Sequence, residues 1–187
     1  SSSGYVKSYH ESVTISNASF ATASNPYSSG NTFSGWSAIE TESKAFGAII
    51  NTIDDNSSNS FAKNKSSYHL DENPLHYGND TRVLMINSLT KDGRSQEAKK
   101  GYRSSSITLQ ANSYYKFSVA VKTALTEAQA NAGASVSASI YLNGIKDKNG
   151  ESVAIGYEGI TTNNEWKEVT FFVATGKESQ SVTFDLY

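Results

Sequence analysis

The sequence lacks cysteine altogether and contains only 2 prolines among its 187 residues. Without cysteine there can be no disulfide, no thiolate metal ligand and no thiol nucleophile, so the hydrophobic core has to hold the fold without covalent help. Charge is also scarce, because Asp, Glu, Lys and Arg make up 18% of the chain and the formal net charge is -2. A chain with no basic cluster creates no field that collects phosphates, which excludes nucleic acid as a partner.

Long apolar runs are missing as well. No segment approaches the ~18 apolar residues of a membrane-spanning helix, so the sequence predicts no insertion into a membrane. The polar residues are instead mostly Ser, Asn and Thr, and the chain also contains 11 Tyr. Such a weakly charged, hydroxyl-rich surface is typical of exported bacterial proteins, and we predict a secreted or cell-surface location. It suits a neutral polyol or another protein as a partner.

Catalytic signatures are not found in the sequence. There is no Gly-x-Ser-x-Gly motif, and nothing singles out a pair of carboxylates for glycoside hydrolysis. The sequence therefore predicts a domain that is not an enzyme.

A two-residue hydrophobic period dominates the second half of the chain, in segments 114–122, 135–142, 166–173 and 181–187. Successive side chains of a strand point to opposite faces, so one face of each segment belongs to a core. The predicted core residues are Tyr115, Phe117, Val119, Val121, Val136, Ile140, Val169, Phe171, Val182 and Phe184. Only segment 126–132 has helical character, and it is too short to be stable alone.

Further strands are expected at 13–16, 45–53, 82–87, 102–109 and 153–157, and segment 63–80, which contains Pro74, is expected to be a long surface loop. Many short strands with almost no helix predict an all-β fold, a jelly-roll β-sandwich of two antiparallel sheets. Residues 1–10 are interpreted as a linker or tag remnant with a strand leading into the domain, and residues 11–187 as one domain.

The order of several motifs resembles the family 4/9/22 carbohydrate-binding modules, which share a galactose-binding-like jelly roll. The motifs are Asn17-Ala18-Ser19-Phe20, Gly35-Trp36, the strand at 82–88, Tyr-Tyr-Lys-Phe-Ser-Val-Ala-Val-Lys at 114–122, Ala-Ser-Ile-Tyr at 138–141 and Trp-Lys-Glu-Val-Thr-Phe at 166–171. The resemblance covers about residues 13–187 and is interrupted at 44–80. It implies a non-catalytic domain that binds a glycan or polysaccharide. The alternative is a structural or adhesive jelly-roll domain that binds other domains of a large bacterial surface protein.

The same resemblance implies a structural calcium ion near the chain ends. The family often has an acidic residue after the Phe at the place of Phe20, where this chain has Ala21-Thr22. Asp185 and Glu11 are therefore the candidate calcium ligands, and no other cofactor is expected.

Aromatic rings on the polar side of the strands are the candidates for stacking on a sugar ring. Trp36 and Trp166 are assigned to the framework instead. The predicted ligand-binding residues are the rings Tyr141, Tyr187, Phe172 and Tyr102, the hydroxyl partners Asp185, Glu168 and Arg82, and the loop rings Tyr68 and Tyr77. Tyr141 is the leading candidate, and the loop around Tyr68 and Tyr77 is the alternative site.

Overall fold

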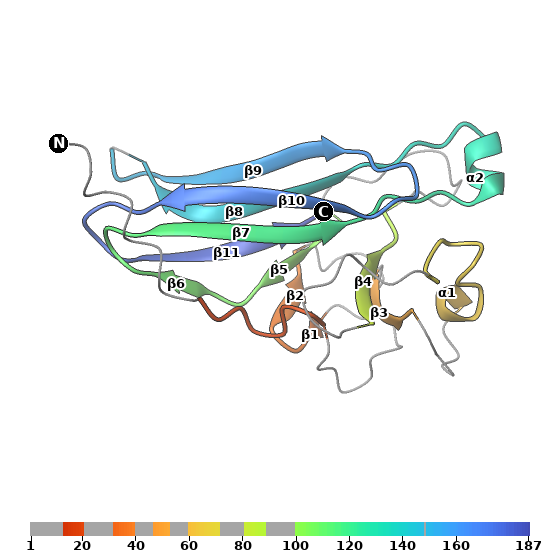
Figure 1. Cartoon of the computed structure of the whole chain (residues 1–187), viewed down its shortest axis with the longest axis horizontal. Coiled ribbons are helices and arrows are strands. Elements are labelled where there is room, and N and C mark those ends of the chain that lie inside the picture. Colours follow the sequence, from red (N-terminus) through yellow and green to blue (C-terminus); the bar gives the residue numbers. More distant parts are fainter. Residues whose placement is uncertain are drawn as a thin grey trace.

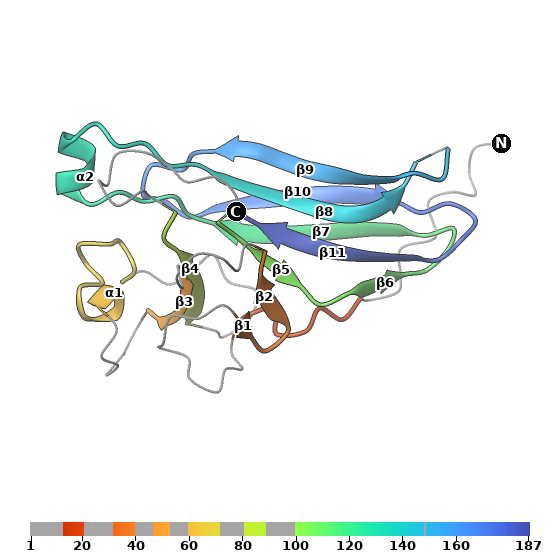
Figure 2. The same cartoon turned by 180° about the vertical axis from the view of Figure 1, so that it is seen from behind.

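The computed structural model describes residues 13–20, 32–39, 47–52, 60–71, 81–88, 100–147 and 149–187. Its elements, in chain order, are β1 (Thr32–Phe33), β2 (Trp36–Ala38), β3 (Gly47–Asn51), α1 (Ser60–Lys63), β4 (Arg82–Ile86), β5 (Tyr102–Ser104), β6 (Ile107–Leu109), β7 (Tyr114–Val121), α2 (Glu127–Asn131), β8 (Ala138–Lys146), β9 (Ser152–Ile160), β10 (Lys167–Ala174) and β11 (Gln180–Leu186). The long strands β7 to β11 run side by side, and β1 to β4 with α1 gather on one side of them (Figures 1 and 2).

All described strand pairs are antiparallel. The largest sheet has the order β1-β2-β5-β11-β8-β9, and β6 also pairs with β11. β10 pairs with β7, and β3 pairs with β4. The expected all-β antiparallel sandwich is thus confirmed. The described strands, however, form three hydrogen-bonded sheets where two were expected, because β3 and β4 pair only with each other among these residues.

The main core lies between the β7–β10 sheet and strands β8 and β11. Its centre is aromatic: the Phe117 ring lies 5.1 Å from Phe184, and Phe171 lies 6.0 Å from Phe184. The period-two prediction is confirmed for the six buried residues Tyr115, Phe117, Ile140, Phe171, Val182 and Phe184. Val119, Val121 and Val169 are partly buried and pack against this core, whereas Val136 precedes β8 and is half-buried.

The strand pair β3–β4 is buried on both faces. Ile49 packs into the main core and Leu84 packs against it. Ile50 and Val83 point the other way, into a second cluster against which Trp166 packs. Burial on both faces explains why the sequence shows a continuous apolar run here instead of alternation.

Two expected strands differ in the structure. The strand expected at 102–109 is divided at residues 105–106 into β5 and β6, which pair with different parts of β11. At the break, the Ser105 amide donates to the Gly35 carbonyl at 2.8 Å. The strand expected at 13–16 is not formed, although Val13 and Ile15 still pack against the main core.

The predicted helical segment and the first part of the predicted loop agree with the structure. The short helix α2 begins after Thr126, whose side chain accepts from the Gln129 amide while the Gln129 side chain accepts from the Thr126 amide. In the loop expected at 63–80, residues 64–69 form turns after α1, and Pro74 lies outside the described residues. No described helix has the length and apolar character needed to cross a membrane.

Candidate functional site

Polar side chains gather on the face of the seven-stranded sheet that points away from the core. Arg103 on β5 lies opposite Asp185 on β11, which lies opposite Tyr141 on β8. Their chain neighbours Tyr102, Leu142 and Phe184 are buried, so alternation turns the polar residues outward. We call this surface the polar face and define it by Arg103, Tyr141, Asn143, Glu158, Asp185 and Tyr187.

An ion pair forms the centre of the polar face. Arg103 Nε and Nη2 each donate to one carboxylate oxygen of Asp185 at 2.8 Å. Asn143 Nδ2 and Thr183 Oγ1 also donate to this carboxylate. Asp185 is only 1% exposed, whereas the Arg103 side chain is 47% exposed. The hydrogen bond with Asp185 raises the pKa of the Arg103 guanidinium, which stays charged and has donors left that face solvent.

Two tyrosine rings lie beside the ion pair. The Tyr141 and Tyr187 ring centroids are 5.9 Å apart, in an edge-to-face arrangement. The Tyr141 hydroxyl donates to Glu158 Oε1 at 2.5 Å, and this bond raises the pKa of Tyr141. The position opposite Tyr141 on β9 is Gly156, where an added Cβ would lie 1.9 Å from the Ile140 carbonyl oxygen. The glycine therefore lets the β9 backbone approach the β8 backbone closely at Tyr141.

This arrangement offers groups that can bind a ligand. A partly exposed ring can stack on an apolar surface of a ligand, while the guanidinium, carboxylate and amide around it exchange hydrogen bonds with hydroxyl groups. Among the described residues no group of three or more metal-ligating side chains occurs. Asp185 is one of the two expected calcium ligands, and its carboxylate oxygens accept hydrogen bonds from Arg103, Asn143 and Thr183. Glu11, the second expected ligand, lies outside the described residues. Calcium stays a prediction.

Tyr102 is not on the polar face, and the prediction that its ring is exposed is wrong. Its exposed fraction is 0%, and its ring lies 5.3 Å from Phe33 in the main core. Burial raises the pKa of Tyr102 to about 12. Along β5, Tyr102 and Ser104 point inward and Arg103 points outward. The charge on Arg103 was the available signal for this orientation, because an unpaired charge is rarely buried.

The remaining predicted residues are spread over the molecule. Phe172 and Glu168 lie on the outer face of β10, on the opposite side of the sandwich from Tyr141, and Phe172 is 76% exposed. Arg82 begins β4, opposite Asn51. Tyr68 follows α1, and its ring lies 4.8 Å from Phe61.

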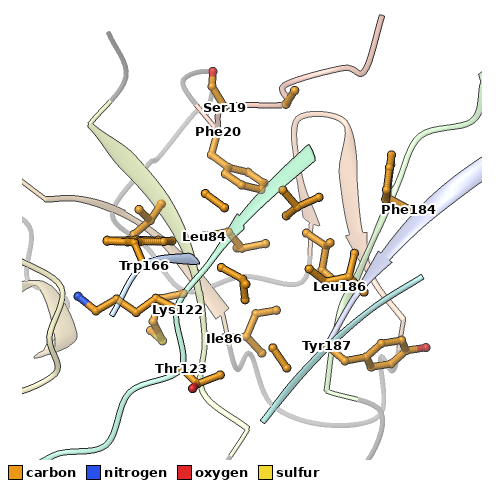
Figure 3. Close-up of a pocket in the computed structure, with 18 of the residues that line it drawn as sticks. Ser19, Phe20, Leu84, Ile86, Lys122, Thr123, Trp166, Phe184, Leu186 and Tyr187 are labelled. Carbon is orange, nitrogen blue, oxygen red and sulfur yellow. The ribbon is translucent and has the colours of Figure 1, made fainter. Parts of the chain in front are cut away.

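Tyr77 lies outside the described residues. Of the predicted set, Tyr141, Tyr187 and Asp185 meet on the polar face, whereas Tyr68, Arg82 and Phe172 line a cavity beside β7 that Tyr187 also borders (Figure 3).

Sequence reasoning missed Arg103, Asn143 and Glu158. Asn143 lies just beyond the segment 135–142 that the alternation marks, whereas β8 continues to Lys146. Glu158 lies beyond the expected end of its strand at 157, whereas β9 runs to Ile160. In both cases the error is an element boundary, which local patterns define poorly.

Comparison with solved structures gives a distant likeness. The sequence matches no family profile and no curated protein. Among solved structures it is similar to the N-terminal CBM22-1 and GH10 modules of endo-1,4-beta-D-xylanase 10B from Clostridium thermocellum, complexed with xylohexaose. The TM-score is 0.44 and the identity 14%, over 81% of this chain and 23% of that chain. This chain thus spans less than a quarter of that structure's length.

Proposed function

We propose that this domain binds a glycan on the polar face. The observation that carries the proposal is the partly exposed Tyr141 ring, which lies beside the Tyr187 ring and donates its hydroxyl to Glu158. The apolar face of a sugar ring packs well on an aromatic ring, and its hydroxyls need donors and acceptors close by. Arg103 and Glu158 supply these groups.

The polar face is long enough for several sugar units. One row of paired residues crosses five neighbouring strands and consists of Ser37, Arg103, Asp185, Tyr141 and Gly156. With ~4.8 Å between strands, the row spans ~19 Å. A linear oligosaccharide lying across the strands would contact both Tyr141 and Arg103.

The binding proposed here is non-catalytic, reversible and modest. Each hydrogen bond to a sugar hydroxyl replaces one to water, with a net gain of about 0.5–1.5 kcal/mol. Because the Arg103 charge is already paired with Asp185 and a sugar hydroxyl is neutral, salt should have little effect. The hydroxyl-rich, weakly charged composition supports a secreted or cell-surface setting, where glycans are available.

Titration of a polysaccharide panel against wild type, Tyr141→Ala and Tyr141→Phe tests the proposal. We expect Tyr141→Ala to weaken Kd by at least about tenfold without a change in Tm, because the ring contributes ~1.4 kcal/mol of stacking and little to the core. Tyr141→Phe keeps the ring and should retain most of the affinity.

The matched control is Tyr114→Ala, which removes a tyrosine that is 42% exposed on β7. It should bind like wild type. Glycan binding that survives in Tyr141→Ala would move the site away from the polar face, towards the turns around Tyr68.

A structural or adhesive role is the second candidate. It is favoured by Phe172, a large ring that is 76% exposed on the opposite side of the sandwich. Aromatic residues, Phe among them, are enriched in protein interfaces. Failure of the wild-type domain to bind any glycan in the panel would favour this role.

A further inference from the structure

Strand β9 forms an edge of the seven-stranded sheet. It is the last strand in the sheet order, and within the part of the chain that the structure describes it pairs only with β8. Figures 1 and 2 both show β9 as the outermost of the long strands. Most of its residues are exposed. The backbone N–H and C=O groups on its outer side are therefore available to pair with another strand.

The middle of β9 has few of the features that keep an edge strand from pairing. Residues 153–157 contain no charge and no proline, and 154–157 lie between the two register shifts of the β8–β9 pair. On the polar face this stretch presents only Ala154 and Gly156, which let another backbone approach. Natural sheets protect exposed edges with Lys, Pro or a covering segment, so an edge without them is a site where a further strand can pair.

A second copy of the same strand fits this edge. Two β9 strands related by a two-fold axis perpendicular to the sheet run antiparallel, like every described strand pair within the chain. With the axis at Ile155, Ala154 lies opposite Gly156 of the second copy, so small residues meet on the polar face. On the inner side, Val153 lies opposite Tyr157, whose side chain is 48% exposed in the single chain. Pairing would cover part of this ring.

Charge complementarity supports the same register. Lys146 lies opposite Ser152 of β9, and its ammonium group reaches towards the edge, because Nζ donates to Ser152 Oγ at 3.0 Å. With the axis at Ile155, Glu158 lies opposite Ser152 of the second copy and faces the Lys146 ammonium group of that copy. Glu158 Oε1 accepts from Tyr141, which leaves Oε2 for this contact. Two-fold symmetry forms the ion pair twice.

We propose that the β9 edge is a self-association surface, on which two copies of the protein join their sheets into one continuous sheet. The contact is a strand edge, smaller than the ~800 Å² per partner of a stable interface, so the dimer should be weak and should depend on concentration.

The dimer places both polar faces on the same side of the joined sheet, because the axis is perpendicular to the sheet. The two Tyr141 rings then lie on strands that are three spacings apart, ~14 Å, within the length of one linear oligosaccharide. A glycan that contacts both copies would bind more tightly than to one. This consequence rests on the proposed glycan binding, whereas the dimer itself does not.

Sedimentation velocity of the wild-type chain without glycan, from about 5 µM to about 500 µM, tests the self-association. We expect the sedimentation coefficient to rise with concentration from the monomer value towards that of a dimer. Hydrogen exchange of the β9 amides should be slower at the high end of this range, because pairing protects their outward N–H groups. A chain that stays monomeric throughout would overturn the proposal, whatever the outcome of the glycan titrations.

Ala154→Lys tests whether the contact uses β9. It places two like charges close to the axis of the dimer and should abolish self-association. The matched control is Ala174→Lys, which adds the same charge at an exposed alanine on β10 and should associate like wild type. The Tm of each variant shows whether it folds. A dimer that persists in Ala154→Lys, or that is lost in Phe172→Ala, would contradict the β9 edge as the contact.

A charge exchange tests the register. Glu158→Lys brings two ammonium groups together and should weaken the dimer by at least about tenfold. The double variant Lys146→Glu/Glu158→Lys restores opposite charges and should recover most of the wild-type association. A double variant that associates as weakly as Glu158→Lys would contradict the register centred on Ile155.

Discussion

Single residues on the polar face depend on partners far away in the chain. Arg103 and Asp185 are separated by 82 positions, yet they form a two-point ion pair because β5 and β11 align them. A carboxylate that is 1% exposed needs several donors around it, and Asn143 and Thr183 complete the set. Asp185 therefore positions Arg103 and is not itself available to a ligand.

Tyr102 should make the fold sensitive to alkaline pH. Its pKa rises from 10.0 to about 12 because burial disfavours the phenolate. The folded-state pKa lies above the unfolded one, so this stabilisation is complete below pH 10 and is lost as the pH rises towards 12. A shift of this size corresponds to about 3 kcal/mol.

Tyr102→Phe removes this titration. We expect the variant to lose less stability than wild type between pH 10 and pH 12, as measured by urea unfolding at each pH. Identical pH profiles for the two proteins would show that Tyr102 does not titrate from a buried site.

At the scale of elements, the β8–β9 hairpin gives the polar face its shape. Its register shifts twice, between Ala138 and Ile140 and between Asn143 and Ile145. Such irregularities bend a strand and re-aim its side chains. Between the two shifts, Gly156 lies against the β8 backbone, closer than any side chain would allow.

Gly156→Ala should therefore destabilise the hairpin. Its Cβ would lie 1.9 Å from the Ile140 carbonyl oxygen and 2.8 Å from the Tyr141 Cα, so β9 has to move. We expect a loss of about 1–3 kcal/mol in the free energy of unfolding, the usual cost of overpacking, and weaker glycan binding.

Gly176→Ala is the matched control, because an added Cβ at Gly176 meets nothing within 4 Å. Its stability should equal that of wild type within about 0.5 kcal/mol. A Gly156→Ala protein as stable as this control would mean that the two strands are not in such close contact.

At the scale of the whole molecule, the two layers are joined by side chains as well as by the core. Tyr157 on β9 crosses to the other sheet, where its ring lies 5.3 Å from Phe171 and its hydroxyl donates to the Thr170 carbonyl at 3.0 Å. It thereby links two strands that are not hydrogen-bonded as neighbours.

Hydrogen exchange should follow this architecture. β11 and β8 are paired on both sides within the seven-stranded sheet, whereas residues 64–69 form turns outside any sheet. We expect amides in 64–69 to exchange at least about a hundredfold faster than those of β8 and β11. Mass spectrometry of pepsin fragments measures the difference, and equal protection would contradict the loop assignment.

The period-two pattern of the sequence predicts much of the fold. Tyr115, Phe117, Phe171 and Phe184 were placed in the core because alternation in a strand is a local property of the sequence. The helix α2 lies within segment 126–132, where the sequence shows helical character, and a capping box of Thr126 and Gln129 stabilises its first turn. Tyr102 was misplaced because a three-residue strand is too short to show which of its two faces is buried.

The sequence by itself determined the β class, the core faces of the long strands and the position of Tyr141 on a polar side. Only the tertiary structure decided that Arg103, Asp185 and Glu158 join Tyr141, that Phe172 lies on the opposite side of the sandwich, and that a cavity opens beside β7. The physical reason is that alternation assigns a residue to a face of its own strand, while strand order and register decide which residues share a surface.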